Sequence, residues 1–290
     1  MRSKGMAGLM PLLAPVHLLI LSVIVVPSVY VVWLSLSEST FGRAPRFVGL
    51  ANYVNTLTDP AFLGALWNTV VLVVVAVHLE LLLGLGFALL FAGGLPFRRL
   101  LLVAVLAPYA VSEVVAVAMW RFLFDPDVGP ISVALRSLGL PILDWSFEPS
   151  HAMILVGLLT IWIHLPFTFI ILYAARLAIP QDLYEAARID GATAWQAFVR
   201  VTAPLLAPAM IVALLFRYIF AFRIFSEVWL LTQGGPARST EVLAVYLYRE
   251  AFSYNAFGTA SATAWLMVFL SLVLGFGYVL LLRRQVAHAR

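Results

Sequence analysis

Six long apolar runs account for most of this chain, and they constrain its fold more than any other feature. Each run is long enough to cross, as a helix, a bilayer hydrocarbon core of about 30 Å. The chain is 63% hydrophobic and 11% charged, whereas soluble domains are roughly half apolar and one quarter charged. We therefore expect an all-α, polytopic membrane protein with six transmembrane helices. The expected spans are residues 10–36, 66–92, 100–124, 152–175, 205–231 and 258–282.

The spans and their loops use up the 290 residues, so we expect one transmembrane domain over 1–290 and no separate soluble domain. The first run follows Arg2 and Lys4, as the apolar part of a signal peptide would. It is longer than such a segment, is interrupted by prolines and ends without a clear cleavage site. We therefore interpret it as a retained span.

The basic residues predict an orientation, because loops rich in Arg and Lys stay on the cytoplasmic side of a membrane. With the N-terminus inside, the cytoplasmic segments are the two termini, 93–99 and 178–204, and the outside segments are 37–65, 125–150 and 233–257. The cytoplasmic side then holds Arg2, Lys4, Arg98, Arg99, Arg176, Arg188, Arg200, Arg283, Arg284 and Arg290, whereas the outside holds Arg43, Arg46, Arg136, Arg238 and Arg249. Both termini are therefore expected in the cytoplasm.

Several kinds of chemistry are excluded by residues that the chain lacks. Without cysteine it can form no disulfide and no thiolate metal site. Its only lysine is Lys4, so it carries no Walker-type ATP site, in which a lysine lies beside the phosphates. His78 and Glu80 lack further ligands in a recognisable spacing, so we expect no metal site and no cofactor in this chain. The basic residues are scattered at span ends, which argues against binding of nucleic acid.

One polar segment, residues 178–204, interrupts the apolar pattern on the expected cytoplasmic side. Pro180 opens a short helix, and Thr193 with Gln196 forms a capping box for a second one. We expect Gly191 to end the first helix and to let the two helices meet where any Cβ would interfere. Trp195, with Phe198 and Val199, is expected to supply a buried face. The alternative is an amphipathic helix lying on the inner leaflet.

The residues of this segment carry a resemblance. Glu185-Ala186-Ala187, Asp190-Gly191 and then Val201-Thr202-Ala203-Pro204 resemble the cytoplasmic loop of permease subunits of ABC importers. That family usually has Ile where Val201 stands and Leu where Ala203 stands, so contact details are expected to differ. The resemblance implies that 178–204 is a coupling loop that docks onto an ATPase subunit. The residues implied in coupling are Glu185, Ala186, Ala187, Asp190 and Gly191.

A second set of motifs resembles the carbohydrate-uptake permeases of the maltose, trehalose and glycerol-phosphate type. The matching residues are Asn52-Tyr53, Asn68-Thr69, Leu231-Thr232-Gln233-Gly234-Gly235-Pro236, Thr240, Tyr246 and Gly258-x-Ala260-Ser261-Ala262. The resemblance implies the type I ABC importer permease fold in the cytoplasmic (inner) membrane. It also implies a non-enzymatic subunit that forms half of the pathway for a disaccharide or small oligosaccharide, with glycerol-phosphate or another polyol as the alternative substrate.

The same resemblance implies the partners of the chain. They are a second, different permease subunit, two ATP-binding subunits that bind ATP and Mg, and an extracytoplasmic solute-binding protein that delivers the sugar. ATP-driven closure of the ATPase subunits would reach the spans through the coupling loop and produce alternating access.

Ionisable residues inside the expected spans are candidates for function, because a charge in a bilayer is unfavourable. They are His78, Glu80, Glu113, Arg121, His164, Arg217, Arg223 and Glu227. Arg223 is the leading substrate-binding candidate, with Phe222, Phe225 and Glu227 beside it, because sugar sites combine forked donors with aromatic faces. The family resemblance adds His164 and Phe167 on span four. The alternatives are ion pairs that hold helices together and a core histidine without contact to substrate.

Two other classes of membrane protein have weaker support. A proton-driven secondary transporter using Glu80, Glu113 and His164 is expected to show an inverted internal repeat, and none is visible. An intramembrane enzyme would need a nucleophile with its base or a metal pair. The chain has no cysteine, no G-x-S-x-G motif and no H-E-x-x-H motif.

Overall fold

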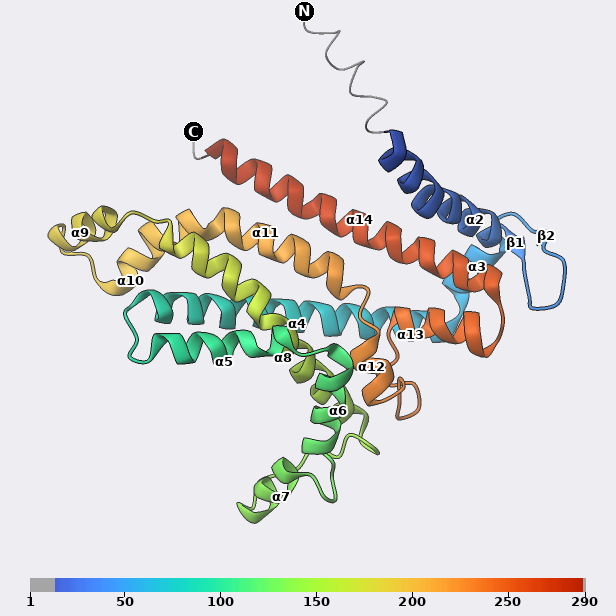
Figure 1. Ribbon diagram of the computed structural model, residues 1–290, viewed down its shortest axis with the longest axis horizontal. Coiled ribbons are helices and arrows are strands. Elements are labelled where there is room, and N and C mark those ends of the chain that lie inside the picture. Colours follow the sequence, from blue (N-terminus) through green and yellow to red (C-terminus); the bar gives the residue numbers. More distant parts are fainter. Residues whose placement is uncertain (1–13, 289–290) are drawn as a thin grey trace, which may run out of the picture. The chain divides into compact units, whose positions relative to one another are not determined.

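A computed structural model describes residues 14–288, which are mostly helical (Figure 1). The expected basic residues Arg2, Lys4 and Arg290 lie outside the described residues. The chain packs as two compact units. Unit 1 contains the residues up to Phe62 together with Leu247–Leu266, and unit 2 contains Leu63–Tyr246 together with the residues from Met267 onward. This grouping concerns packing alone, so a single permease domain over 1–290 stays a prediction.

Unit 1 combines short elements from both ends of the chain. Its elements are the π-helical turn η1 (Leu21–Val25), α2 (Val26–Ser35), β1 (Ser37–Glu38), β2 (Arg46–Phe47), α3 (Ala51–Thr58), the π-helical turn η3 (Arg249–Ser253), and the first parts of α4 (Pro60–Ala92) and α14 (Phe257–His288). The two strands pair antiparallel. The Asn52 side chain donates to the carbonyl oxygens of Ser35 and Ser37, each at 2.9 Å, and the Tyr53 hydroxyl lies 2.8 Å from Ser35 Oγ. Asn52 and Tyr53 therefore fix the end of α2.

Gly258 lies where α14 meets this corner of unit 1. A Cβ on Gly258 would stand 2.3 Å from the Ser37 carbonyl oxygen and 2.9 Å from Asn52 Nδ2. Because the nearest atom is backbone, Gly258→Ala is expected to destabilise the protein by about 1–3 kcal/mol, the usual range for overpacking. Thermal unfolding in detergent measures the effect. Gly277→Ala on the same helix is the control, since outside that helix's own backbone no described atom lies within 4 Å of its Cβ position. An equal fall in both variants would contradict the close-packing explanation.

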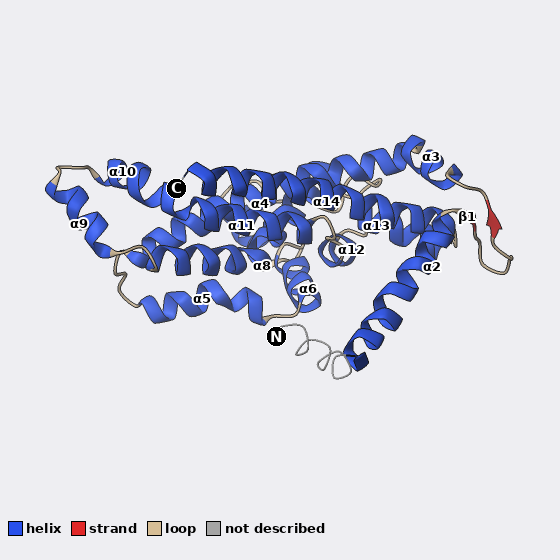
Figure 2. Cartoon of the chain, turned by 90° about the horizontal axis from the view of Figure 1, so that it is seen from above, coloured by secondary structure: helices blue, strands red, loops and turns tan. Residues whose placement is uncertain are grey.

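Unit 2 is built on long helices. In Figure 1 α8 runs obliquely across α4, α5 and α11, and α8 packs against both α5 and α11. Figure 2 shows the same helices from above. Proline opens several elements, at Pro60, Pro130 and Pro149, where the missing amide proton needs no partner. The elements after α4 are α5 (Arg98–Ala110), α6 (Glu113–Leu123), α7 (Pro130–Ser137), α8 (Pro149–Leu177), α9 (Gln181–Ile189), α10 (Ala194–Ala197), the π-helical turn η2 (Phe198–Thr202), α11 (Ala203–Ala221), α12 (Ser226–Leu231), α13 (Leu243–Tyr248) and the remainder of α14.

Among the apolar clusters of the described residues, two join α8 to its neighbours. One joins α4 to α8 through Phe91, Phe169 and Tyr173, with the Phe169 and Tyr173 rings stacked 5.2 Å apart. The other joins α6, α8 and α12 around Leu155, Leu159 and other fully buried side chains. Close packing of this kind drives helix association where lipid removes the hydrophobic contribution.

Within the described residues, five helices are long and apolar enough to span a membrane. They are Ala14–Ser35, Pro60–Ala92, Pro149–Leu177, Ala194–Ala221 and Phe257–Gly277. The pair α5 and α6 makes a sixth span if the two are counted together, but it is bent by 105°. The expected number of six spans is therefore reached only if the bent pair α5 and α6 is counted as one span.

Two of the expected spans are not continuous helices, and this corrects the prediction. Residues 100–124 break at Val111 and Ser112, which are extended and follow Ala110, the last residue of α5. Residues 205–231 break after Ala221, where the amides of Arg223 and Ile224 bond three residues back, to Phe220 and Ala221, instead of four. Both breaks lie next to the cavity described below.

The segment that precedes the second span shows how capping places a helix start. The sequence of residues 47–69, with Asp59-Pro60 as a helix cap, predicts two surface helices in the headgroup region, and α3 is the first of them. The second is absent as a separate helix, because α4 begins at Pro60 and continues into the span. The Asp59 carboxylate accepts a 2.9 Å hydrogen bond from the Ala61 amide, so the expected Asp59-Pro60 cap is confirmed.

Candidate substrate cavity and coupling loop

A cavity of about 280 Å³ lies in unit 2 where both broken spans meet α8. Non-helical backbone inside a membrane is tolerated where it lines such a cavity. Of the six residues predicted to bind substrate, five line it. The full lining is Tyr109, Glu113, Thr160, His164, Phe167, Arg217, Phe220, Ala221, Arg223, Ile224, Phe225, Ser226 and Glu227. A substrate role for these five stays a prediction, but they are brought to one place.

Arg223 occupies the break between α11 and α12. Its side chain is exposed to the cavity. The alternative to substrate binding is a fixed ion pair of Arg223 with Glu113 or Glu227. Over residues 14–288 Arg223 forms no ion pair, so both are absent from the described structure. An arginine always carries its charge, so the cavity contains a guanidinium that is available to hydrogen-bond acceptors.

His164 and Glu227 form the polar wall of the cavity. His164 Nε2 lies 3.0 Å from Glu227 Oε1, which joins α8 to α12. The Glu227 side chain is buried and the His164 side chain is partly exposed. Both residues were predicted to bind substrate, and in the structure they contact each other. The Glu227 carboxylate keeps further lone pairs that can accept hydrogen bonds, and part of the His164 ring still faces the cavity.

The aromatic residues divide between the cavity and the core. Phe225 stacks on Trp229 with ring centroids 6.0 Å apart, and Phe167 meets Phe220 edge to face at 6.4 Å. Phe222 does not reach the cavity and is 4% exposed, because its end of α11 faces α4, where it packs with Val73 and Val77. Phe222 is therefore the one of the six predicted residues that does not line this cavity, and its contact with substrate stays a prediction.

Glu80 and Arg217 form a buried ion pair that was not among the site residues predicted from the sequence. Arg217 Nε and Nη2 donate to the two Glu80 carboxylate oxygens at 2.5 and 2.8 Å. Glu80 is 0% and Arg217 is 3% exposed. The pair joins α4 to α11, and Arg217 also borders the cavity. Both charges were visible in the sequence, but the residues are far apart along the chain, so only the fold could pair them.

The expected coupling loop forms a helix, a tight turn and a second helix. Gly191 follows α9 with φ of 72°, a left-handed conformation that favours glycine. The capping box is confirmed: Thr193 N donates to Gln196 Oε1 at 2.8 Å, and Gln196 N donates to Thr193 Oγ1 at 3.3 Å. Apart from Gly191 and its two chain neighbours, no atom of residues 14–288 lies within 4 Å of a Gly191 Cβ. The expected reason for Gly191, close approach of two helices, is therefore wrong, and the reason is backbone conformation.

The base of the loop is held by contacts that the sequence did not indicate. The Arg176 guanidinium lies 4.3 Å from the Tyr184 ring centroid, and the Tyr184 hydroxyl lies 2.9 Å from Thr202 Oγ1. The tip is open: Ile189 is 86% exposed and Trp195 is 71% exposed. Trp195 was expected on a buried face, and that is wrong for this chain. α9 and α10 lie at one end of unit 2, at the left in both views (Figure 1 and Figure 2).

The motifs of the second resemblance meet at the loop before α13. Asn68 donates to the Glu241 carbonyl oxygen at 3.0 Å, and the Leu243 amide donates to Thr69 Oγ1 at 2.9 Å. Thr240 Oγ1 donates to the Gly235 carbonyl oxygen at 2.8 Å. Asn68-Thr69 and the Gly-Gly-Pro loop are therefore parts of one structure, although more than 160 residues separate them.

Comparison with known proteins identifies the class of this chain. The family described as "binding-protein-dependent transport system inner membrane component" matches residues 80–288. The trehalose/maltose transport system permease protein MalF of Thermococcus litoralis is 35% identical over 271 residues, covering 93% of this chain and 91% of that protein. The sulfoquinovosyl glycerol transport system permease protein SmoG of Agrobacterium fabrum is 35% identical over 279 residues, covering 94% and 90%.

A solved structure has the same fold. It is a chain of a bacterial alginate ABC transporter, crystallised in complex with an alginate pentasaccharide-bound periplasmic protein. It matches with a TM-score of 0.85 at 22% identity and covers 97% of this chain and 96% of that chain. The chain has the type I fold of ABC importer permeases. It belongs to the family of inner membrane components of binding-protein-dependent transport systems.

Proposed function

We propose that this chain forms half of the pathway of an ATP-driven importer for a disaccharide or small oligosaccharide of the trehalose or maltose kind. The observation that carries the proposal is the cavity at the two span breaks. It offers the Arg223 guanidinium as a donor, the Glu227 carboxylate as an acceptor, and the rings of Phe167 and Phe225. Sugars present hydroxyls and apolar C–H faces, which suit such a mixture of groups.

The relatives support a sugar as the substrate. Two of them are named as permeases for trehalose/maltose and for sulfoquinovosyl glycerol, and the structural neighbour comes from an alginate transporter. A glycerol-phosphate or polyol substrate is the alternative within the same family. A proton-coupled secondary transporter is not favoured, since family membership accounts for the 178–204 segment and that alternative does not.

The proposal includes the partners that were expected. A second, different permease would complete the pathway, two ATP-binding subunits would bind ATP and Mg and dock at Glu185–Gly191, and a solute-binding protein would deliver the sugar outside. The support is the exposed tip of the coupling loop, where Ile189 and Trp195 leave large apolar surface uncovered. Closure of the ATP-binding subunits would move this loop, and α11, which continues from it through η2, would transmit the motion to the cavity.

Co-purification tests this proposal without knowledge of the sugar. Affinity capture of the tagged chain from its native membrane, in mild detergent, is expected to bring down a second permease and an ATP-binding subunit. Recovery of the chain alone, after cross-linking in intact cells as well, would contradict the proposal.

Arg223→Ala tests the cavity directly. Because Arg223 has no ion pair in the described structure, the variant is expected to assemble normally and keep near-parental basal ATP hydrolysis. Loss of hydrogen bonds from a charged donor, about 1.5–3 kcal/mol, predicts roughly 10- to 100-fold weaker sugar uptake. Uptake by proteoliposomes is the measurement, and Arg136→Ala, an exposed arginine away from the cavity, is the control. Parental uptake of every candidate sugar would exclude this role.

The orientation is proposed from the arginine distribution and has its own test. Both termini, 93–99 and 178–204 are placed in the cytoplasm. The chain has no cysteine, so Thr193→Cys provides a clean single label. We expect an impermeant maleimide to react only after the membrane is opened. Labelling from outside intact cells would reverse the proposed orientation.

A further inference from the structure

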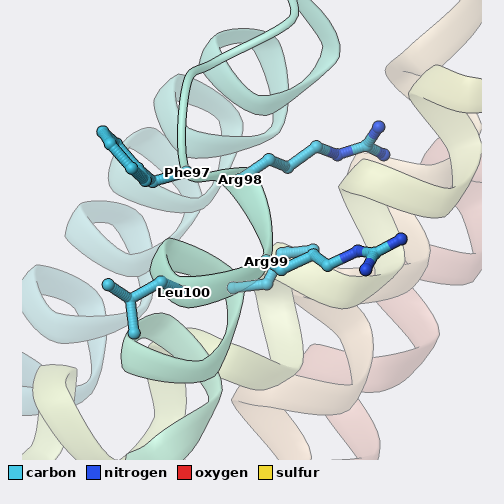
Figure 3. Close-up of a pocket in the computed structure, with 5 residues that line it drawn as sticks. Phe97, Arg98, Arg99 and Leu100 are labelled. Atoms are coloured by element: carbon cyan, nitrogen blue, oxygen red, sulfur yellow. The ribbon is translucent and has the colours of Figure 1, made fainter.

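A second concave surface, separate from the substrate cavity, lies at the start of α5. It has a volume of about 500 Å³ and is lined by Phe97, Arg98, Arg99, Leu100 and Leu102, which we call the α5 basic pocket. Figure 3 shows Arg98 and Arg99 extending to the same side, whereas Phe97 and Leu100 extend to the opposite side. The surface therefore has a cationic side and an apolar side along one short segment.

The local structure fixes this arrangement. Phe97 has a φ of 54°, and its carbonyl oxygen accepts hydrogen bonds from the amides of Leu100 and Leu101 at 2.9 and 3.1 Å. Arg98 donates to the Tyr173 hydroxyl on α8, and its guanidinium lies 5.4 Å from the centroid of that ring. One of the two arginines is therefore held in place by a neighbouring helix.

The two charges are not neutralised by protein carboxylates. The segment Gly93–Leu102 contains no acidic residue. In the described part of the chain, neither Arg98 nor Arg99 forms an ion pair with Asp or Glu. The apolar side is equally uncovered, since Phe97 is 82% and Leu100 is 70% exposed. A partner that matches this surface has to bring negative charge and apolar surface together.

We propose that the α5 basic pocket binds the headgroup of an anionic phospholipid. The guanidinium groups of Arg98 and Arg99 would donate to the phosphate, for which their forked geometry is suited. Phe97 and Leu100 would lie against the upper acyl chains, as aromatic and apolar residues do at a membrane interface. Basic pockets at the ends of transmembrane helices are a recognised class of lipid site. A soluble anion would satisfy the arginines but leave the apolar side exposed to water. The inference is independent of which substrate is transported.

Quenching by brominated lipids tests the proposal on the full-length chain. Leu101→Cys gives the chain its only cysteine, and a fluorophore is attached there. The labelled chain is placed in vesicles of equimolar phosphatidylglycerol and phosphatidylcholine. In separate experiments, one or the other lipid is brominated. Phosphatidylglycerol is expected to quench more strongly. Each arginine near an anionic surface contributes about 1 kcal/mol. The preference of the pocket for phosphatidylglycerol over phosphatidylcholine should therefore fall about fivefold in Arg99→Gln and about 30-fold in Arg98→Gln/Arg99→Gln.

The controls distinguish binding at this pocket from a general effect of net charge and from misfolding. Arg43→Gln/Arg136→Gln removes the same net charge at two residues that do not line the pocket and should keep the preference. Arg99→Gln removes no contact that holds helices together, so it remains informative if the double variant misfolds. An unchanged preference in Arg99→Gln, or an equal loss in the Arg43/Arg136 variant, would overturn the proposal. Excess inorganic phosphate at constant ionic strength should have no effect; abolition of the preference would indicate a site for a free anion instead.

Discussion

Replacing Arg217 by alanine is expected to prevent accumulation of the folded chain. The change leaves the Glu80 carboxylate, which is fully buried between α4 and α11, without its two charge-assisted hydrogen bonds. Removal of one partner from a buried ion pair destabilises a protein by about 3–5 kcal/mol, and an unpaired charge within a membrane span is unfavourable in addition. Size-exclusion profiles and thermal unfolding of the extracted protein measure the loss.

A double variant shows whether the uncompensated charge is the cause. Glu80→Met/Arg217→Met removes both charges and fills the space with apolar side chains of similar length, so it should recover most of the folded protein. Arg223→Ala is the matched control, because it removes an arginine from the same region that has no ion pair in the described structure. If the double variant is as poorly folded as Arg217→Ala, the Glu80–Arg217 pair is not the reason for the loss.

Gly191→Trp is expected to abolish sugar uptake and sugar-stimulated ATP hydrolysis while membrane insertion stays normal. A residue with a Cβ is strained by about 1–2 kcal/mol at the positive φ of this position. The large ring would also stand on the exposed tip of the coupling loop, beside Asp190, within the Glu185–Gly191 segment where we propose that the ATP-binding subunit docks. Uptake and ATP hydrolysis are measured on the same reconstituted complex.

Gly191→Asn separates the two causes of that loss. Asparagine adopts left-handed backbone conformations more readily than most residues. Apart from the two chain neighbours, no atom of the described residues lies within 4 Å of the Cβ position. The variant should therefore keep most of the uptake. Normal uptake by Gly191→Trp would exclude the docking role of the loop, whereas loss in both variants would show that the docked partner itself requires glycine.

Helix ends could be predicted from the sequence because single side chains determine them. Asp59 and Pro60 place the start of α4, Gly191 ends α9, and the Thr193 capping box starts α10, each through local hydrogen bonds or backbone preference. Span lengths were predictable for a similar reason, since the bilayer thickness imposes them. These features need only the order of residues along the chain.

The breaks within the spans and the pairing of charges could not be predicted in this way. No Gly or Pro occurs between Ala209 and Gln233, so nothing local marks the break after Ala221. Pairing of Glu80 with Arg217, and of His164 with Glu227, depends on which helices become neighbours. Phe222 lies next to Arg223 in sequence, but the turn between them directs one residue to the core and the other to the cavity.

The most direct test of the proposed importer is sugar uptake by proteoliposomes that contain this chain with its co-purified permease and ATP-binding subunit. Labelled trehalose and maltose are supplied outside with the solute-binding protein, and ATP is enclosed or omitted. Uptake that requires both ATP and the binding protein, and that is lost in Gly191→Trp, is the expected result. Uptake that follows an imposed proton gradient and does not depend on ATP would contradict the proposed function.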